Sequence, residues 1–265
     1  MKMQKLFDVT GNVSVVTGAS SGIGLAMAEV MAENGARVIM IDINAERLNT
    51  VATTMQKAGL AVEPTVIDVS DSARLRAAID DAVARHKRLD SVFANAGISA
   101  GPGFAMTSKG QIEAVDLANW DKVLQVNLTS VLVTIAAAAV HMKHQRGGRI
   151  IATSSTAGLM AEPLVGYGYI AAKAAITNLI RQAAMELAPY NVMVNAICPA
   201  AFITNLAGGL MSRDPVARAK MEERVALRRL AKTDEIKGLA LLLASPASSF
   251  ITGAAIAIDG GLTAS

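Results

Sequence analysis

Short apolar runs and amphipathic stretches alternate along most of the chain. The first run, Val13–Thr17, is rich in β-branched residues, and an Ala-rich helical pattern follows it to about Asn34. The pattern repeats, which predicts strands at 13–17, 36–41, 61–67, 89–94, from 149, 192–197 and 254–258, and helices to 34 and at 45–58, 72–86, 118–146, 169–189, 204–229 and 233–243. Strand–helix units joined by short connections predict an α/β fold with a parallel sheet and right-handed crossovers.

Two segments break this rhythm. Residues 98–117 carry Gly101-Pro102-Gly103 and Lys109-Gly110, which indicate an irregular, exposed loop. Residues 204–229 are polar, with Gly208-Gly209 as a hinge, and we expect a lid over a substrate there. No linker or repeat divides residues 1–265, so we expect one domain.

Composition narrows the class of protein. Just over half of the 265 residues are hydrophobic, while aromatic residues make up 3%. Such a composition suits strands buried on both faces. The formal charge is +3 and the basic residues are dispersed, which argues against a nucleic-acid partner.

The sequence also argues against a metal site and a membrane span. Cys198 is the only cysteine, and its strand-end context favours a packed thiol over a nucleophile. His86, His141 and His144 lie in polar helical contexts, and the pair His141 and His144 lacks an obvious carboxylate partner, so we expect no metal. No signal peptide is evident, and the apolar run at 131–142 is too short to span a bilayer, which predicts a cytoplasmic protein.

A glycine-rich turn joins the first strand to the first helix. Gly18 permits the tight turn, Gly22 allows backbone to approach phosphates, and Gly24 allows close packing of helix on strand. Free backbone amides and the helix dipole favour a pyrophosphate at this point. The spacing G-x-x-x-G-x-G differs from the standard fingerprint, so the position after strand one carries the argument.

Asp42 ends the second strand, eighteen residues after Gly24. A carboxylate there can accept hydrogen bonds from the ribose hydroxyls of an adenosine and repel a 2′-phosphate. It therefore favours NAD over NADP as cofactor, and Arg37 is too far back along the strand to hold a 2′-phosphate.

The segment 150–173 combines a buried strand, two serines and a helix bearing Tyr169 and Lys173. Residues four apart on a helix share a face, so the phenol and the ammonium are expected to be neighbours. Tyr167 lies six residues before Lys173 and is expected to face away from it. We expect Ser154 to cap backbone at the strand end.

With Thr17-Gly18-x-x-x-Gly22-x-Gly24, Asn95-Ala96-Gly97 and Tyr169-x-x-x-Lys173 in this order, the chain resembles the classical short-chain dehydrogenases/reductases over nearly its whole length. The resemblance implies a Rossmann-like, doubly wound sheet of seven parallel strands in a three-layer α/β/α sandwich. It also implies a homotetramer.

The resemblance further implies roles for individual residues. Ser155 would position the substrate oxygen, Tyr169 act as acid/base, Lys173 bind the nicotinamide ribose, and Asn127 organise a proton-relay water. The implied cofactor contacts are Gly18, Ser20, Ser21, Gly22, Ile23, Gly24, Asp42, Ile43, Asp68, Val69, Asn95, Ala96, Gly97, Tyr169, Lys173, Pro199, Phe202 and Thr204.

Such chemistry requires the pKa of Tyr169 to fall from near 10 by about 2–3 units, or roughly 3–4 kcal/mol. We expect Lys173 and a positive nicotinamide ring to supply this in a water-poor cleft.

Three departures from the family pattern concern the substrate side. The interval from Ser155 to Tyr169 is one residue longer than the commonest one, Ala200 replaces the usual glycine after Pro199, and the loop 98–117 is long. We expect this loop to rim the cleft or a subunit contact. Apolar cleft walls are expected from Met160, Leu164, Phe202, Leu206, Leu210 and Met211, although the same side chains could simply pack the lid on the sheet.

The leading hypothesis is an NAD-dependent oxidoreductase acting on a small neutral secondary alcohol, polyol or cyclic alcohol. One alternative is an NADPH-dependent carbonyl or 3-oxoacyl-thioester reductase, against which Asp42 argues. Another is a non-catalytic regulator that senses the dinucleotide, against which the full set of Asn127, Ser155, Tyr169 and Lys173 argues.

Overall fold

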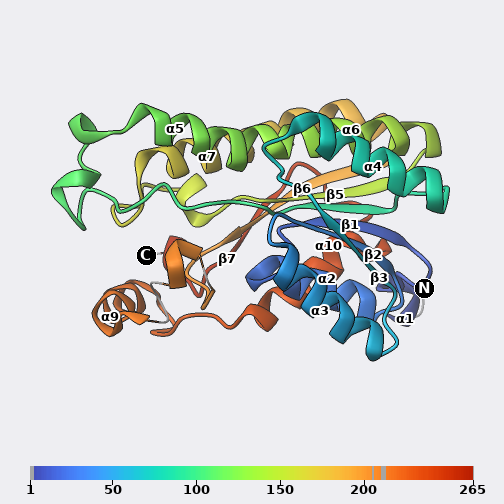
Figure 1. Cartoon of the computed structure of the whole chain (residues 1–265), viewed down its shortest axis with the longest axis horizontal. Coiled ribbons are helices and arrows are strands. Elements are labelled where there is room, and N and C mark those ends of the chain that lie inside the picture. Colours follow the sequence, from blue (N-terminus) through green and yellow to red (C-terminus); the bar gives the residue numbers. More distant parts are fainter. Residues whose placement is uncertain (1–2, 205, 210–212, 265) are drawn as a thin grey trace.

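One parallel sheet of seven strands forms the centre of the computed structural model, which describes residues 3–204, 206–209 and 213–264. The strands follow the spatial order β3-β2-β1-β4-β5-β6-β7 (Figure 1). Their bounds are β1 Val13–Thr17, β2 Arg37–Asp42, β3 Val62–Val66, β4 Ser91–Ala94, β5 Gly148–Thr153, β6 Val192–Pro199 and β7 Ala255–Ile258. The strand order reverses between β1 and β4, where an open sheet of this kind forms its ligand crevice.

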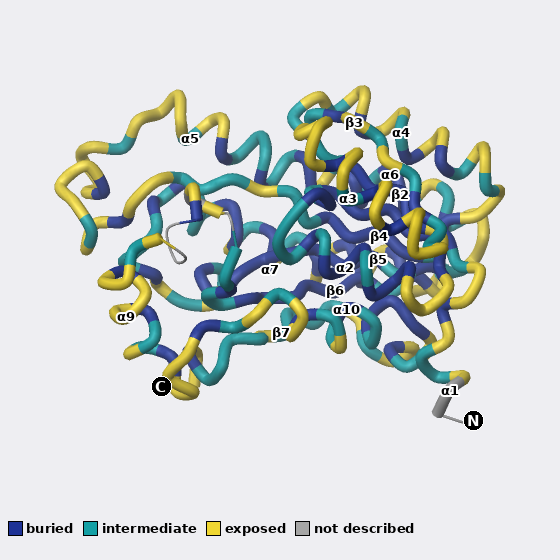
Figure 2. Tube along the Cα trace, turned by 60° about the horizontal axis from the view of Figure 1, so that its bottom comes forward, coloured by how far each residue is buried: buried dark blue, intermediate teal, exposed yellow. Residues whose placement is uncertain are grey.

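Helices cover both faces of the sheet, which confirms the Rossmann-like three-layer sandwich (Figure 1). One face carries α2 (Gly22–Glu33), α3 (Ala45–Lys57) and α10 (Lys237–Ala244); the other carries α4 (Ser72–His86), α5 (Leu117–Leu124), α6 (Ser130–Gln145) and α7 (Tyr167–Leu187). Each face has its own buried core, with Met27, Met31 and Leu48 in one and Leu75, Ile135 and Ile176 in the other. The buried positions follow the strands and the inner sides of these helices (Figure 2).

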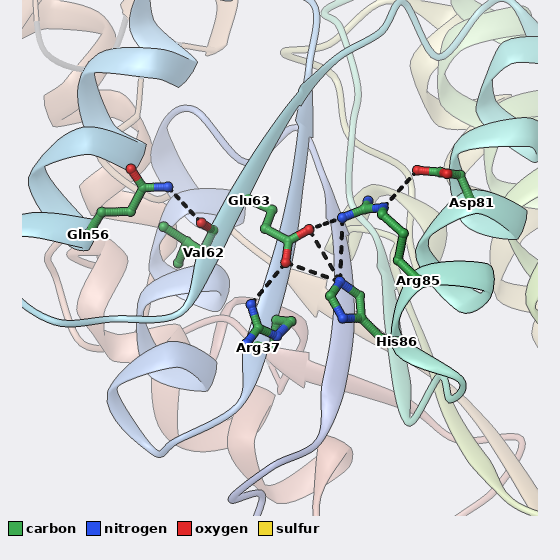
Figure 3. A network of polar contacts seen from close by, with 7 residues as sticks. All are labelled: Arg37, Gln56, Val62, Glu63, Asp81, Arg85 and His86. Atoms are coloured by element: carbon green, nitrogen blue, oxygen red, sulfur yellow. Dashed lines mark hydrogen bonds and ion pairs between the residues drawn. The ribbon is translucent and has the colours of Figure 1, made fainter.

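The edge strand β3 differs from the central strands. All five residues of β1 are buried, as two covering layers require, whereas β3 contains Pro64 and exposes alternate residues. On β3, Glu63 accepts hydrogen bonds from Arg37 and Arg85 and also contacts His86 (Figure 3). Arg37 therefore pairs with Glu63 at the start of β2, and Asp42 lies at the other end of the strand, as expected from the sequence.

Residues Leu117–Gln145 form one continuous helical stretch of 29 residues, long and apolar enough by composition to cross a membrane. The argument from a short apolar run was therefore wrong. The stretch is instead a core helix of the fold, because Val131, Ile135 and Met142 pack in the buried cluster. A π-helical turn, Gln125–Thr129, interrupts it and contains Asn127.

The predicted helix 204–229 was only partly correct. The structure has a short 3-10 turn at Leu206–Gly209 and the helix α9 (Pro215–Arg224), and residues 205 and 210–212 lie outside the described part of the chain. Pro215 and the Asp214 cap start α9 late, since Asp214 accepts from the amides of Val216 and Ala217. The predicted helix 233–243 begins as a 3-10 turn, Thr233–Ile236, and a short helix α1 (Met3–Leu6) was not expected.

Candidate active site

The glycine turn after β1 is tightly packed. Gly18 and Gly22 have φ of +69° and +58°, which favours glycine. A Cβ on Gly24 would lie 2.1 Å from the Gly18 carbonyl oxygen, and one on Gly18 would lie 2.9 Å from the Ala96 Cα. The backbone of the turn thus follows a path that side chains would block, in contact with the end of β4.

The N-terminus of α2 is suited to bind an anion. Its N-cap residue, Ser21, makes no side-chain cap hydrogen bond, whereas Asn44 and Asp71 cap α3 and α4 in that way. The first amides of α2 are therefore left to a ligand or solvent, and the helix dipole makes a pyrophosphate favourable there. Ile23 and Gly24 belong to this first turn, which fits the pyrophosphate of a dinucleotide.

Asp42 lies beside the glycine turn. Its carboxylate accepts from the backbone amide of Ser20 at 3.0 Å and from that of Asn44 at 3.0 Å. The carboxylate thereby links the end of β2 to the turn, where an adenosine ribose would meet it. The adjacent Ile43 is largely exposed, at 65%.

Asp68 and Val69, on the expected adenine side, follow β3. The Asp68 carboxylate accepts from the amide of Ser70 at 2.9 Å, and this hydrogen bond lowers its pKa. Val69 is buried in the core.

Asn95 connects three strand ends. Its backbone amide donates to the Thr17 hydroxyl at 2.9 Å, and its side-chain amide donates to the Thr17 carbonyl at 3.1 Å. The Thr153 hydroxyl in turn donates to the Asn95 side-chain oxygen at 3.0 Å. The ends of β1, β4 and β5 are thus held in a fixed relation, and the Ala96 amide also donates to the Thr17 hydroxyl at 3.1 Å.

Ser155, Tyr169 and Lys173 come together beyond the end of β5. The Lys173 ammonium donates to the Thr153 carbonyl at 2.7 Å and lies 5.5 Å from the centre of the Tyr169 ring. The Ser155 side chain forms a hydrogen bond with Tyr169 and donates to the Pro199 carbonyl at 3.3 Å. Tyr167 is the first residue of α7 and lies outside this group.

Burial shifts both titrating groups of this cluster away from their charged forms. It raises the pKa of the Tyr169 phenol, and the hydrogen bond with Ser155 opposes this only in part. It lowers the pKa of the Lys173 ammonium to about 8. Burial thus acts against the lowered tyrosine pKa, and the lowering that we expect from Lys173 together with a nicotinamide ring stays a prediction.

Asn127 is completely buried in the π-helical turn. Its side-chain oxygen accepts from the Ile98 amide at 2.8 Å, and its NH₂ group donates to the Ile98 carbonyl at 2.9 Å. The side chain thus fixes the backbone just after Gly97.

Ser154 and Cys198 have structural partners. The Ser154 hydroxyl donates to the Lys173 carbonyl at 2.8 Å and lies 3.0 Å from the Thr177 hydroxyl. It ties β5 to α7 rather than capping the strand end. The Cys198 thiol is buried on β6 beside Ser154, and burial raises its pKa, which keeps it a packed thiol.

The segment after β6 carries the remaining expected cofactor contacts. The Pro199 carbonyl accepts from Ser155, and Thr204 lies over the glycine turn, where a Cβ on Gly22 would be 3.3 Å from its methyl group. Phe202 is 5% exposed and packs in the core with α2 and α10. Leu210 and Met211, expected in the cleft wall, lie outside the described residues.

Sequence reasoning missed three contributors to the site. Thr153 supplies both the carbonyl that holds Lys173 and the hydroxyl that orients Asn95, and its position directly before the two serines could have indicated this. Glu162 and Arg224 form an ion pair across the cleft walls, with 2.5 Å between Oε1 and Nη1. No local pattern predicts a pair 62 residues apart.

Comparison with known proteins agrees with this geometry. The family model described as enoyl-(acyl carrier protein) reductase matches residues 18–263. The chain is 38% identical over 252 residues to cis-4-hydroxycyclohexanecarboxylate dehydrogenase of Sinomonas cyclohexanicum, covering 95% of this chain and 96% of the relative. This chain belongs to the short-chain dehydrogenase/reductase family.

Two solved structures of the family are similar throughout. A gluconate 5-dehydrogenase from Burkholderia cenocepacia J2315, in complex with NADP and tartrate, matches with a TM-score of 0.91 and 32% identity over the whole of both chains. A 3-oxoacyl-[acyl-carrier protein] reductase with bound NAD from Brucella melitensis matches with a TM-score of 0.86 and 33% identity, over 98% of this chain and 94% of its own. As a short-chain dehydrogenase/reductase, the protein is an oxidoreductase that acts on CH–OH groups with an NAD(P) dinucleotide.

Proposed function

We propose that the protein is an NAD-dependent oxidoreductase that interconverts a small secondary alcohol, polyol or cyclic alcohol and its ketone. One observation carries the proposal: Ser155, Tyr169 and Lys173 meet beyond β5, on the same edge of the sheet as the glycine turn and Asp42. This arrangement brings a proton-transfer group next to the expected nicotinamide position.

The side chains would divide the work between them. The nicotinamide ring, when bound, supplies the hydride acceptor or donor at its C4 atom. The Ser155 hydroxyl holds the carbinol oxygen, and the Tyr169 phenol exchanges the hydroxyl proton. Lys173, fixed by the Thr153 carbonyl, holds the nicotinamide ribose and places positive charge near the phenol.

Preference for NAD rests on Asp42. A carboxylate at the end of β2 repels a 2′-phosphate, and Arg37 is occupied by Glu63 at the other end of the strand. The alternative is an NADPH-dependent carbonyl or 3-oxoacyl-thioester reductase. Initial rates with the two cofactors decide between them.

A substrate screen tests the proposal directly. The purified protein is given NAD with cyclic alcohols, polyols, hydroxysteroids and hydroxyacyl thioesters, and NADH formation is followed at 340 nm. We expect turnover of a neutral secondary alcohol. Tight NAD binding without turnover across the panel would instead favour the dinucleotide-sensing regulator.

We also propose that the chain forms a homotetramer. Leu132 and Val140 on α6 and Met185 on α7 are exposed apolar side chains on the outer helical layer, which a second copy could cover. Light scattering during size-exclusion chromatography measures the mass. A cytoplasmic location stays a prediction.

A further inference from the structure

A half-buried ion pair joins two segments that begin at the candidate active site. Glu162 lies midway between Ser155 and Tyr169, in the loop that connects them, and its side chain is 5% exposed. Arg224 ends α9, in the segment that follows β6 and Pro199. The Arg224 guanidinium donates to Oε1 of Glu162 at 2.5 Å, and the same oxygen accepts from the Leu164 amide at 3.1 Å.

This pair is unlike the exposed pair on the same helix. Arg218 and Glu222 are one turn apart on α9, so their contact fixes nothing outside the helix. Exposed pairs of that kind contribute little to stability. A carboxylate as buried as Glu162, in contrast, is costly without its partner, and removing either charge weakens the contact between the two segments.

The Glu162 loop is itself bonded to the other wall of the cleft. Three backbone hydrogen bonds, each of 3.1 Å, join it to the loop 98–117: Gly103 N–H to Leu164 O, Ala105 N–H to Pro163 O, and Gly166 N–H to Gly101 O. The ion pair therefore connects α9 to both loops. Among the described residues, it is the ion pair that joins a side chain of α9 to these two loops.

The pair also sets the charge of the wall. Arg224 is a cation at the end of α9, and Nη1 of its guanidinium already contacts the Glu162 carboxylate, which lies in the expected cleft wall. A carboxylate on a substrate would have to displace Glu162, an internal group held at high effective concentration. A neutral alcohol meets no such competition.

We propose that Glu162 and Arg224 are specificity-determining residues: their ion pair holds α9 against the wall and, by neutralising Arg224, selects neutral over carboxylate-bearing alcohols. This inference rests on the proposed function, since it concerns the substrate of that same site. Neither side chain takes part in proton or hydride transfer.

The variants Glu162→Gln and Arg224→Gln test the pair, with Arg218→Gln as the matched control on α9. Glutamine at 162 retains an oxygen that can accept from Leu164, so only the charge is lost. The substrates are cyclohexanol and 4-hydroxycyclohexanecarboxylate, compared by their kcat/KM values. We expect Glu162→Gln to raise the carboxylate-to-neutral ratio at least tenfold, because it frees Arg224, and expect Arg224→Gln and the control not to raise it.

Hydrogen exchange of α9 in the free protein gives a readout that needs no turnover. We expect both variants at the pair to speed exchange of the amides in 215–224 about fivefold or more, and Arg218→Gln to leave it unchanged. Unchanged exchange in both variants would overturn the proposal even if the enzyme turned over no alcohol at all. A wild-type preference for the carboxylate that Arg224→Gln abolishes would overturn it too, because Arg224 would then bind substrate.

Discussion

The two sides of the site are held together in different ways. On the cofactor side, the ends of β1, β2, β4 and β5 are joined by side chains that reach the neighbouring strand or turn, as Asn95 does with Thr17 and Asp42 with Ser20. On the substrate side, the walls are joined by backbone hydrogen bonds between loops and by the pair Glu162–Arg224. The first side rests on the sheet, and the second rests on contacts between loops.

This difference separates chemistry from selectivity. The strand ends carry the groups expected to bind the cofactor and transfer the proton, and every substrate would need these groups. A substitution at a strand end therefore alters the reaction of all substrates. A change in the walls alters how the loops pack, while the strand ends stay in place. Substitutions on the cofactor side are therefore expected to affect all substrates alike, and substitutions in the walls to affect some substrates more than others.

The largest expected effect is that of Tyr169→Phe. Removing the phenolic hydroxyl removes the proton-transfer group, and we expect kcat to fall about 10³-fold for every alcohol tested. Tyr167→Phe is the control, since Tyr167 starts α7 outside the cluster, and its kcat should stay within a few-fold of wild type. Near-normal turnover by Tyr169→Phe would remove the basis for assigning chemistry to this side.

The next effect concerns the cost of burying Lys173. Burial lowers its folded-state pKa to about 8, below the ordinary value of 10.5 for lysine. The unfolded chain therefore binds the extra proton between these values, so the penalty is fully present below pH 8 and disappears as pH rises to 10.5. Relative to Lys173→Met, wild type should gain about 3 kcal/mol of unfolding free energy between pH 7 and pH 10.5.

Urea unfolding of both proteins across this pH range measures that gain, and the other titrating groups cancel in the difference. A difference between wild type and variant that does not change with pH would mean that Lys173 keeps an ordinary pKa. Burying the Lys173 ammonium at the strand ends would then not lower the free energy of unfolding.

The cofactor side could be read from the sequence because its determinants are local. The glycine turn, Asp42 and the pair Tyr169 and Lys173 each follow from residues within a few positions of a strand or helix end. Strand alternation in a βα chain then brings all of them to one edge of the sheet. The same regularity explains why all seven strands were correctly expected.

The walls and the pKa values could not be read in the same way. The contact between Glu162 and Arg224 depends on how two loops lie after folding, and the start of α9 depends on Pro215 and Asp214 rather than on hydrophobic periodicity. The raised pKa of Tyr169 arises from burial of its phenol. Charge proximity along one helix can be read from the sequence, whereas burial of the phenol in the folded protein cannot.

A third prediction tests the charge at the end of β2. In Asp42→Asn the side chain can still accept a hydrogen bond from the Ser20 amide, but it no longer repels a 2′-phosphate. We expect the ratio of kcat/KM with NADP to that with NAD to rise about 10- to 30-fold, or roughly 1.4–2 kcal/mol. Asp42→Ala should give a similar ratio with a greater loss of NAD affinity, and an unchanged ratio in both variants would contradict the role of the charge.

The smallest expected effect is in the wall, at Gly103. A Cβ there would lie 2.3 Å from the Pro163 carbonyl oxygen and 2.6 Å from the Val165 amide, so Gly103→Ala must push the two loops apart. Overpacking of this kind costs about 1 kcal/mol or more. We expect KM for the alcohol to rise about fivefold, which corresponds to about 1 kcal/mol.

The dissociation constant for NAD should stay within twofold of wild type. Gly238→Ala on α10 is the control, because a Cβ there meets nothing within 4 Å. Equal losses of NAD and alcohol affinity in Gly103→Ala would show that the walls and the strand ends move as one body, and the division between the two sides would not hold.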